Sequence, residues 1–421
     1  MVHRIACWAV NWNHNNGGAT CAQDRCGGTD MRGSWVRFFA PLMAPAALSL
    51  ALACLLSPAA AQLPLEQTGT LPMPSVRNRI YVGDVSINHI VDGRVHIVDG
   101  DSGKYLGLIG SGMAGQFTQS PDKRELYVAT TYLSRLQRGE RADVVEVYDA
   151  DTLAFKHEIA IEKRRAQALT YRGYVRTSAD GRLLYVLNAT PAVSVSIVDL
   201  QQKKQVAEID TPGCWGIFPA AKHTRRFSTL CGDGTVATFT LNDDGTQPAQ
   251  SGRANSERLF DPAGDALFIH AEQAGDSYWF VSFKGDLIAL DMGQEKASQQ
   301  SRWPLVLGED RKQAWRPGGY APLAFDANRG RLYVAMHKGG KEGSHKLPAN
   351  QIWVIDTKTK KRLARMPGHS AIALNTPASG DLLLYAIDGV KNALVVLGGP
   401  KLSVRHKVAP IGDASVLLES R

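Results

Sequence analysis

Short apolar runs recur seven times along the chain, and each is followed by a stretch in which apolar and polar positions alternate. The apolar runs are centred on positions 81, 127, 185, 228, 279, 333 and 385. The alternating stretches cover 95–99, 144–149, 195–199, 236–241, 287–291, 352–356 and 394–397. Alternation with a period of two is typical of β-strands, and a strand-built repeat of about 50 residues is typical of propeller blades. The pattern therefore predicts an all-β fold, a seven-bladed β-propeller of four-stranded antiparallel blades.

Acidic residues end several of the alternating stretches, at the same place in the repeat. These acids are Asp99, Asp149, Asp199 and Asp356. Because an aspartate side chain accepts hydrogen bonds from the backbone of a tight turn, their regular recurrence favours turn capping over catalysis. Two longer segments, 131–143 and 338–350, interrupt the repeat. We expect both to be polar loops, and loops on a rigid ring are where contacts with other molecules are usually placed.

The first part of the chain lacks the repeat. Residues 1–30 are interpreted as a leader translated from a start codon assigned too early. Residues 31–61 combine a positive flank, an apolar stretch and small residues, which is typical of a secretory signal peptide cut after Ala61. An uncleaved membrane anchor is the alternative. Residues 62–75 are expected to form an N-terminal arm, and 76–421 a single propeller domain.

The charge of the chain argues against nucleic acid as a partner. Its 48 lysines and arginines exceed its 40 acidic residues by only a small margin, for a net charge of +8. No basic stripe with interleaved aromatic residues is present. With the signal peptide removed, no membrane attachment is expected either.

Two of the six cysteines, Cys214 and Cys231, follow the predicted signal peptide. In an exported chain an isolated pair favours a disulfide. The short interval between them suits a bridge between neighbouring strands of one blade. A free redox thiol is the alternative.

Motifs for a resident metal or haem are missing from the sequence. It contains neither the C-x-x-C-H motif of haem attachment nor the H-E-x-x-H motif of zinc sites. Its histidines are scattered, and His96, inside an alternating stretch, is interpreted as a core residue rather than a ligand. The sequence therefore predicts no catalytic residue and no metal site in this chain.

Several long, irregular motifs nevertheless resemble a known family. They lie at Arg79-Ile80-Tyr81-Val82 through His96, at 138–147, at 213–234, at Trp315 to Tyr320 and at 336–356. On these motifs the chain resembles the heavy subunit of periplasmic quinoprotein amine dehydrogenases over nearly all of 65–415. It is most similar to aromatic amine (aralkylamine) dehydrogenase, and more distantly to methylamine dehydrogenase.

The resemblance implies a periplasmic, non-catalytic subunit without a cofactor of its own. Two such subunits would pair with two small, disulfide-rich light subunits that carry tryptophan tryptophylquinone. The complex would convert a primary amine and water to an aldehyde and ammonia, and pass electrons to a blue-copper protein such as azurin or amicyanin. The chain's own tryptophans agree with this role, because they are expected in separate blades or blade connections. They are Trp215, Trp279, Trp303, Trp315 and Trp353.

One loop departs from the family. In the family a phenylalanine after the first Tyr-Val strand reaches the substrate channel, whereas Ile87 or Asn88 stands at that place here. The exchange is expected to widen or reshape the entrance. A second hypothesis for the whole chain is a free-standing exported propeller that acts as a binding module or as a hydrolase of the lactonase type.

Overall fold

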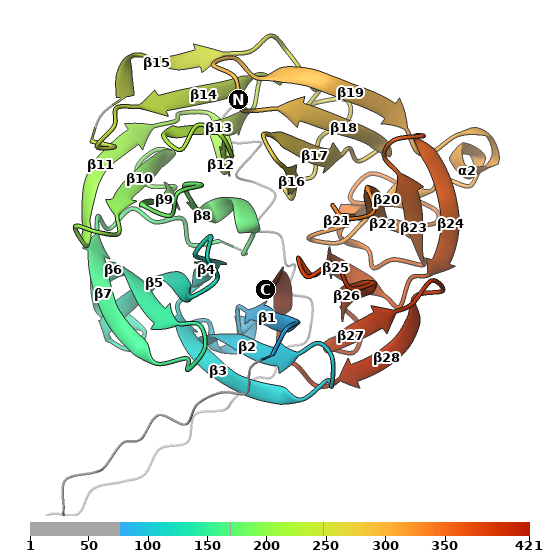
Figure 1. Cartoon of the computed structure of the whole chain (residues 1–421), viewed down its shortest axis with the longest axis horizontal. Helices are drawn as coiled ribbons and strands as arrows, with labels where there is room; N and C mark the ends of the chain where they lie inside the picture. Colours follow the sequence, from blue (N-terminus) through green and yellow to red (C-terminus); the bar gives the residue numbers. More distant parts are fainter. Residues whose placement is uncertain (1–75, 169, 247) are drawn as a thin grey trace, which may run out of the picture. The chain divides into compact units, whose positions relative to one another are not determined.

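The computed structural model describes residues 76–421, apart from 169 and 247. Within these residues 29 strands form seven sheets, which stand as blades around a central axis (Figure 1). The region enclosed by the innermost strands is here named the channel. The prediction of an all-β, seven-bladed propeller is confirmed. The predicted leader (1–30), signal peptide (31–61) and arm (62–75) lie outside the described residues.

Blades are numbered 1 to 7 in chain order, and their strands are given from the channel outward. Blade 1 contains β29 (Ser415–Ser420), β1 (Arg79–Asp84), β2 (Gly93–Asp99) and β3 (Tyr105–Gly112). Blade 2 contains β4 (Gln116–Gln119), β5 (Glu125–Arg135), β6 (Arg138–Asp149) and β7 (Phe155–Ile161). Blade 3 contains β8 (Val175–Thr177), β9 (Leu183–Asn188), β10 (Ser194–Asp199) and β11 (Lys204–Asp210). Blade 4 contains β12 (Cys214–Pro219), β13 (Arg226–Cys231), β14 (Val236–Leu241) and β15 (Pro248–Asn255).

The remaining blades follow the same plan, except that the inner position of blade 6 is shared by two short strands that both pair with β22. Blade 5 contains β16 (Glu272–Ala274), β17 (Ser277–Val281), β18 (Asp286–Asp291) and β19 (Ser298–Pro304). Blade 6 contains β20 (Arg316–Pro317), β21 (Leu323–Asp326), β22 (Arg331–His337), β23 (Gln351–Asp356) and β24 (Lys361–Pro367). Blade 7 contains β25 (Ala371–Asn375), β26 (Leu383–Asp388), β27 (Ala393–Gly398) and β28 (Ser403–Val408). The described helices are η2 (Ile87–His89), η3 (Arg172–Tyr174), α2 (Gly308–Lys312) and η4 (Ser344–Lys346).

The seven apolar runs of the sequence all form the second strand of a blade. A second strand has neighbours in its own sheet and in the adjacent blades, so every residue of β1, β9 and β26 is buried. The outermost strands face solvent on one side and show an alternating pattern of exposure, as β24 does. The alternating stretches of the sequence form the third strands, between the second strands and the outermost ones.

The ring is closed by the end of the chain. β29 pairs antiparallel with β1 from Ile80↔Ser420 to Asp84↔Ser415 and supplies the inner strand of blade 1. The sequence pattern predicted closure but did not single out 415–420 as the closing strand. The apolar run at 415–420 is not followed by an alternating stretch, because β29 completes blade 1, whose other strands come from the N-terminal part of the propeller.

The first insert differs from its prediction. The segment 131–143 was expected to be a polar loop, but β5 and β6 continue to pair as far as Arg135↔Arg138 and form a long hairpin. Thr131 and Asp143 at its base are buried, so the ladder extends beyond the apolar repeat. The second insert, 338–350, is a loop with one short 3-10 turn, as predicted.

Two kinds of connection leave the ring on the same side, because neighbouring strands run antiparallel. They are the links between second and third strands and the links between consecutive blades. We call this side the loop face. It carries residues 85–92 between β1 and β2, the tip of the β5–β6 hairpin, the 338–350 loop, and residues 409–414 between β28 and β29.

Leu418 of β29 is 1% exposed and packs in one cluster with Ile80 and Tyr385. Leu418→Ala should lower the free energy of unfolding by about 2–5 kcal/mol, since truncation of a core leucine leaves a cavity. Denaturant unfolding measures the effect. The control is Val404→Ala in the outer strand β28, where the side chain is 49% exposed and the change should stay within about 0.5 kcal/mol. Equal losses in both variants would contradict a core role for β29.

Candidate functional site

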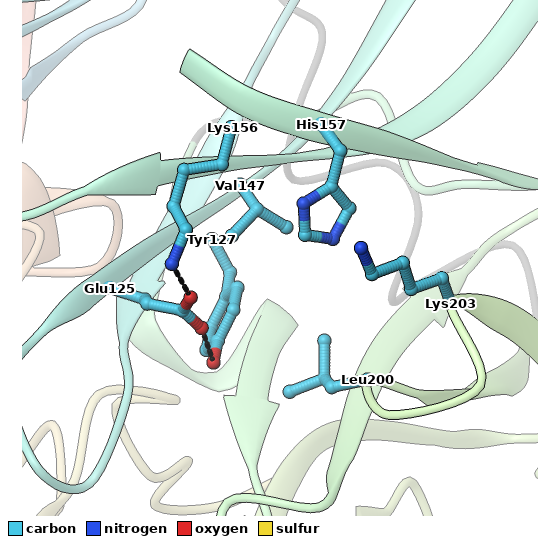
Figure 2. A pocket seen from close by; sticks show the side chains of 7 residues that line it. All are labelled: Glu125, Tyr127, Val147, Lys156, His157, Leu200 and Lys203. Atoms are coloured by element: carbon cyan, nitrogen blue, oxygen red, sulfur yellow. Dashed lines mark hydrogen bonds and ion pairs between the residues drawn. The ribbon is translucent and has the colours of Figure 1, made fainter. Parts of the chain in front are cut away.

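A hollow of about 400 Å³ lies on the outer rim between blades 2 and 3. Figure 2 shows Glu125, Lys156, His157 and Lys203 around it. Glu125 is already engaged, because it pairs with Lys156 and accepts the hydroxyl hydrogen of Tyr127 at 2.7 Å. Burial, followed by the charge of Lys203, lowers the pKa of His157. The hollow is weakly basic and presents no acid–base pair directed at a common point.

The central channel is crossed by Arg172, the first residue of η3. Its guanidinium donates to the carbonyl oxygen of Leu418 in blade 1 at 2.8 and 3.0 Å, and to Glu272 Oε1 in blade 5 at 2.9 Å. His270 Nε2 lies 3.0 Å from the same carboxylate oxygen and 2.9 Å from the carbonyl oxygen of Leu323. The side chains of Arg172, Glu272 and His270 all make hydrogen bonds that join blades. The channel therefore contains an inter-blade hydrogen-bond network rather than an open reaction site.

The charges in this hydrogen-bond network favour the ionised form of Glu272. Burial alone would raise the pKa of Glu272, but the charge of Arg172 and the hydrogen bond from His270 outweigh burial and hold the pKa below its usual value. Such a buried ion pair depends on both partners, since removal of one leaves the other charged and desolvated.

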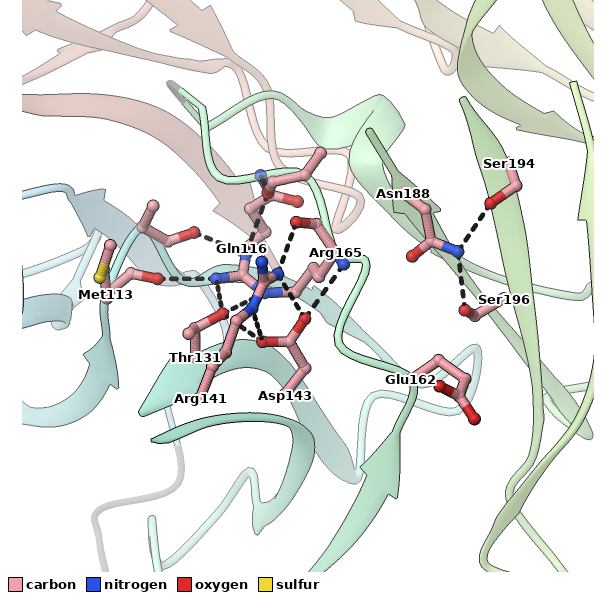
Figure 3. Close-up of polar contacts among 12 residues, drawn as sticks. Met113, Gln116, Thr131, Arg141, Asp143, Glu162, Arg165, Asn188, Ser194 and Ser196 are labelled. Carbon is pink, nitrogen blue, oxygen red and sulfur yellow. Dashed lines mark hydrogen bonds and ion pairs between the residues drawn. The ribbon is translucent and has the colours of Figure 1, made fainter. Parts of the chain in front are cut away.

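The β5–β6 hairpin is fixed to the loop face by a buried arginine (Figure 3). Arg165 is 1% exposed and donates to the carbonyl oxygens of Met113 at 2.7 Å and Ala114 at 2.8 Å, and to Thr131 Oγ1 at 2.9 Å. Its backbone N–H donates to Asp143 Oδ2 at 3.0 Å. Burial lowers the pKa of Arg165 to about 10. Blade 3 therefore holds the base of a hairpin that belongs to blade 2.

The second insert packs against neighbouring loops through aromatic and polar contacts. His337 Nε2 lies 3.0 Å from Ser344 Oγ. The His345 ring centre lies 6.3 Å from that of Phe283, and Lys346 Nζ lies 5.6 Å from the centre of the Tyr320 ring. Burial, and then the charge of Arg316, lower the pKa of His337. The loop face is thus built from ordered segments of several blades.

Ile87 and Asn88 lie on the same face, in the short 3-10 turn η2. The Ile87 side chain is 59% exposed. Asn88 Nδ2 donates to the two carboxylate oxygens of Asp413 at 2.9 and 3.1 Å. The structure places both predicted residues at the surface, beside the segment that closes the ring.

Behind this turn lies Asp84, the last residue of β1, which is 3% exposed. It accepts hydrogen bonds from the backbone N–H groups of Ser86, Asp413 and Ala414 at 2.9, 2.9 and 2.7 Å. Burial would raise the pKa of Asp84, but the nearby His96 imidazole and these three N–H groups hold it far below its usual range. Sequence reasoning missed Asp84 as a site residue, although its place at a strand end was a readable signal.

Cys214 and Cys231 form a disulfide between β12 and β13, where they are directly paired. This confirms the predicted bridge between neighbouring strands of one blade. The predicted turn caps are also confirmed. For example, Asp199 Oδ1 accepts from the N–H groups of Gln201 and Gln202, both at 2.9 Å.

The expected separation of the tryptophans is wrong for Trp279 and Trp303, which both belong to blade 5 and have ring centres 5.4 Å apart. Trp315 lies in the connection between blades 5 and 6, as expected, and its ring centre is 5.6 Å from that of Trp353 in β23. In blade 5, Trp279 pairs with Ala289 of β18, and two residues along β18 Leu287 pairs with Trp303. Both indoles therefore lie on one face of the sheet.

The indoles of Trp303 and Trp353 are covered by cationic side chains. Lys360 Nζ lies 5.3 Å from the Trp303 ring centre, and the Arg362 guanidinium carbon lies 4.3 Å from that of Trp353. Asp310 Oδ2 accepts from Arg362 at 2.7 Å. These contacts account for both indoles as packing between neighbouring segments of the ring.

Metal-binding side chains and membrane-spanning helices both bear on the class of site. Within the described part of the chain, no group of three or more His, Cys, Asp or Glu side chains is arranged to hold a metal ion. Residues 76–421, without 169 and 247, contain no helix with the length and apolar character needed to cross a membrane.

Comparison with solved structures places the chain among β-propeller proteins. A periplasmic gluconolactonase of Pseudomonas aeruginosa superposes with a TM-score of 0.55 at 14% identity, covering 82% of this chain and 98% of that one. A putative 6-phosphogluconolactonase of Bacteroides uniformis gives a TM-score of 0.57 at 12% identity, covering 82% and 99%. At such low identity these similarities show the fold alone.

Sequence comparison is more specific. The chain is 28% identical over 386 residues to the methylamine dehydrogenase heavy chain of Methylophilus methylotrophus, covering 90% of this chain and 93% of that protein. It is 26% identical over 348 residues to that of Methylobacillus flagellatus, covering 82% and 85%. A family model described as methylamine dehydrogenase heavy chain matches residues 76–418. The chain belongs to this family of amine dehydrogenase heavy chains.

Arg172→Met should lower the free energy of unfolding by about 3–5 kcal/mol near pH 7, because it leaves Glu272 buried without its arginine. A carboxylate whose folded-state pKa is depressed stabilises the fold above its ordinary pKa, about 4.3, and loses this contribution as the pH falls below that value. The deficit of the variant should therefore be constant above about pH 5 and shrink as the pH falls below about 4.3, toward the lowered pKa of Glu272. Denaturant unfolding at several pH values measures it.

The matched control is Arg164→Met, which removes a more exposed pair with Glu208 and should cost no more than about 1 kcal/mol. A deficit for Arg172→Met that is the same at every pH would contradict the assignment of an ionised Glu272.

Proposed function

We propose that this chain is the non-catalytic heavy subunit of a periplasmic, tryptophan tryptophylquinone-dependent amine dehydrogenase. The observation that carries the proposal is the family match over 76–418. The complex would convert a primary amine and water to an aldehyde and ammonia, and pass electrons to a blue-copper protein such as azurin or amicyanin. The quinone of the light subunit would supply the oxidising group, while this chain supplies position and shape.

The light subunit is proposed to dock on the loop face, in a complex of two heavy and two light chains. This side of the ring carries the β5–β6 hairpin, the 338–350 loop and the turn with Ile87. Ordered, irregular segments on a rigid ring offer a surface that a partner can recognise. Obligate subunits commonly bury about 2,000 Å² or more, and several of these segments together would contribute to such an area.

Substrate choice is proposed to depend on Ile87 and Asn88 at the channel entrance. The motifs most similar to aralkylamine dehydrogenase favour aromatic or aralkyl amines as substrates, whereas the relatives reported above are methylamine dehydrogenase heavy chains. An isoleucine in place of the family's phenylalanine would leave room for a bulkier amine. Export, with a signal peptide cut after Ala61, belongs to the same proposal.

The alternative, a free-standing propeller acting as a binding module or lactonase-type hydrolase, has less support. Its structural relatives include lactonases, at identities that carry the fold only. The channel, where such an enzyme would place its site, is tied by Arg172 and Glu272. Lactone hydrolysis by the purified chain would favour this alternative.

The purified chain should show no measurable amine oxidation, and co-expression with a small, cysteine-rich light subunit should give a complex that oxidises amines. Artificial-electron-acceptor assays with a series of primary amines measure this, and size-exclusion chromatography reports assembly. Intact-mass analysis of the heavy chain should give the mass of the mature polypeptide with one disulfide. Amine oxidation by the lone chain, or a covalently modified indole in it, would contradict the proposal.

Ile87→Phe should lower kcat/KM of the complex for a bulky aralkyl amine by about tenfold relative to methylamine, because a single change in pocket volume is worth roughly 10- to 200-fold in discrimination. The matched control is Val390→Phe, in the corresponding loop of blade 7, where the side chain is 68% exposed. This control should leave the ratio within about twofold. An unchanged ratio for Ile87→Phe would remove Ile87 from the entrance.

A further inference from the structure

We propose that Asp84 and Asp413 are positioning residues that fix Ile87 at the substrate entrance. They tie residues 85–89, here named the entrance loop, to residues 411–414, here named the closing segment. The inference rests on the proposed function, because it concerns the same entrance. It adds residues that would determine amine specificity without touching the amine.

The entrance loop begins with the buried residues Val85 and Ser86, but its turn η2 has no apolar packing of its own. Ile87, Asn88 and His89 of η2 contain no buried residue, and Ile90 beyond it is 50% exposed. A segment without buried side chains opens at low free-energy cost unless polar contacts hold it. The position of Ile87 therefore depends on the hydrogen bonds of its neighbours.

Asp84 provides the first tie. One of its carboxylate oxygens, Oδ1, accepts from the N–H groups of Ser86 at 2.9 Å and Ala414 at 2.7 Å. The other, Oδ2, accepts from the N–H of Asp413 at 2.9 Å. A single buried carboxylate thus holds the entrance loop and the closing segment together. Bonds from N–H groups to an ionised acceptor are among the stronger hydrogen bonds in proteins.

The same carboxylate stabilises an unusual backbone conformation. Ser86 has φ 45° and ψ 59°, in the left-handed region, which costs an L-amino acid about 1–2 kcal/mol. Its N–H and its hydroxyl both donate to Asp84, at 2.9 and 3.2 Å. Loss of the carboxylate would remove the contacts that favour this turn and, with them, the direction of the following residue.

Asp413 provides the second tie, from the opposite side. Its carboxylate accepts from Asn88 Nδ2 at 2.9 and 3.1 Å and from the Asn88 N–H at 3.3 Å. The N–H of Val85 also donates to the carbonyl oxygen of Ala414 at 3.3 Å. Ile87 is therefore flanked by anchored residues on both sides while its own side chain stays free.

The two segments approach too closely for a side chain between them. Gly412 has φ +75°, and a Cβ placed on it would lie 2.5 Å from Asp84 Oδ2. Only glycine fits such a position without moving the carboxylate.

His96 supports Asp84 from within blade 1. Its Nε2 lies 3.7 Å from Asp84 Oδ2, and its Nδ1 lies 2.8 Å from the Tyr105 hydroxyl oxygen. The carboxylate is thus held between a strand of blade 1 and the closing segment.

The test uses Asp84→Asn and Asp413→Ala in the full-length chain and in its complex with the light subunit. Asparagine keeps the shape of Asp84 but turns an N–H₂ group toward backbone donors, and Asp413 is exposed, so its truncation spares the core. Hydrogen exchange of the amides of residues 85–89 should rise by about tenfold or more in the full-length chain. In the complex, the kcat/KM ratio between a bulky aralkyl amine and methylamine should change by about fivefold, mainly through KM.

The matched controls make the same two substitutions at aspartates outside the entrance loop. Asp199→Asn removes a buried turn cap in blade 3, and Asp233→Ala removes an exposed cap of Thr235 in blade 4. Both should leave the exchange of residues 85–89 and the substrate ratio within about twofold, in line with distant sites acting independently.

The outcomes separate this inference from the proposed function. Unchanged exchange in both variants overturns the two ties. Faster exchange with an unchanged substrate ratio, while Ile87→Phe shifts that ratio, overturns the positioning role and leaves the proposed entrance intact. If Ile87→Phe also fails to shift the ratio, the assignment of the substrate entrance to Ile87 is wrong, and the positioning role of Asp84 and Asp413 is wrong as well.

Discussion

Pairing between β29 and β1 is the constraint on which the rest of the molecule depends. Without β29, β1 would be the inner edge of blade 1, with a row of unpaired backbone groups facing the channel. Its pairing turns seven sheets into a closed ring, and it brings together segments from the two ends of the propeller. The Ile87 turn and residues 411–414 are neighbours because both flank this junction.

Buried arginines stabilise both the interior of the channel and the loop face. Inside, Arg172 joins blade 3 to blades 1 and 5, and its partner Glu272 is held ionised by the charges around it. On the loop face, Arg165 fixes a hairpin that extends beyond the ring. Buried charge is thus used for holding blades and loops in place, which agrees with a family whose heavy chain acts as a subunit of a larger oxidoreductase.

Much of this architecture could be predicted from local sequence. The apolar runs mark second strands because those strands are buried on both faces, and Cys214–Cys231 follows from adjacent strands in one blade. Contacts between blades could not be predicted in the same way. Trp315 lies in a link between blades and packs against Trp353 of β23, which is distant in sequence. Asp84 accepts hydrogen bonds from backbone amides near the other end of the chain. Ile87 and Asn88 were proposed as entrance residues from the resemblance to the family, and the structure gives their location in η2.

Ring closure also has a consequence for the order of events during synthesis. Asp84 and Ala414 are 330 residues apart in sequence, so the first blade to be translated waits for the last strand before it is complete. Blades 2 to 7 draw all their strands from contiguous segments and are free to form one after another as the polypeptide emerges. Contacts between distant segments are slow to form. The turn that carries Ile87 would therefore be among the last parts to reach its native geometry, and a chain that stops short of β29 would have neither a closed ring nor a complete loop face.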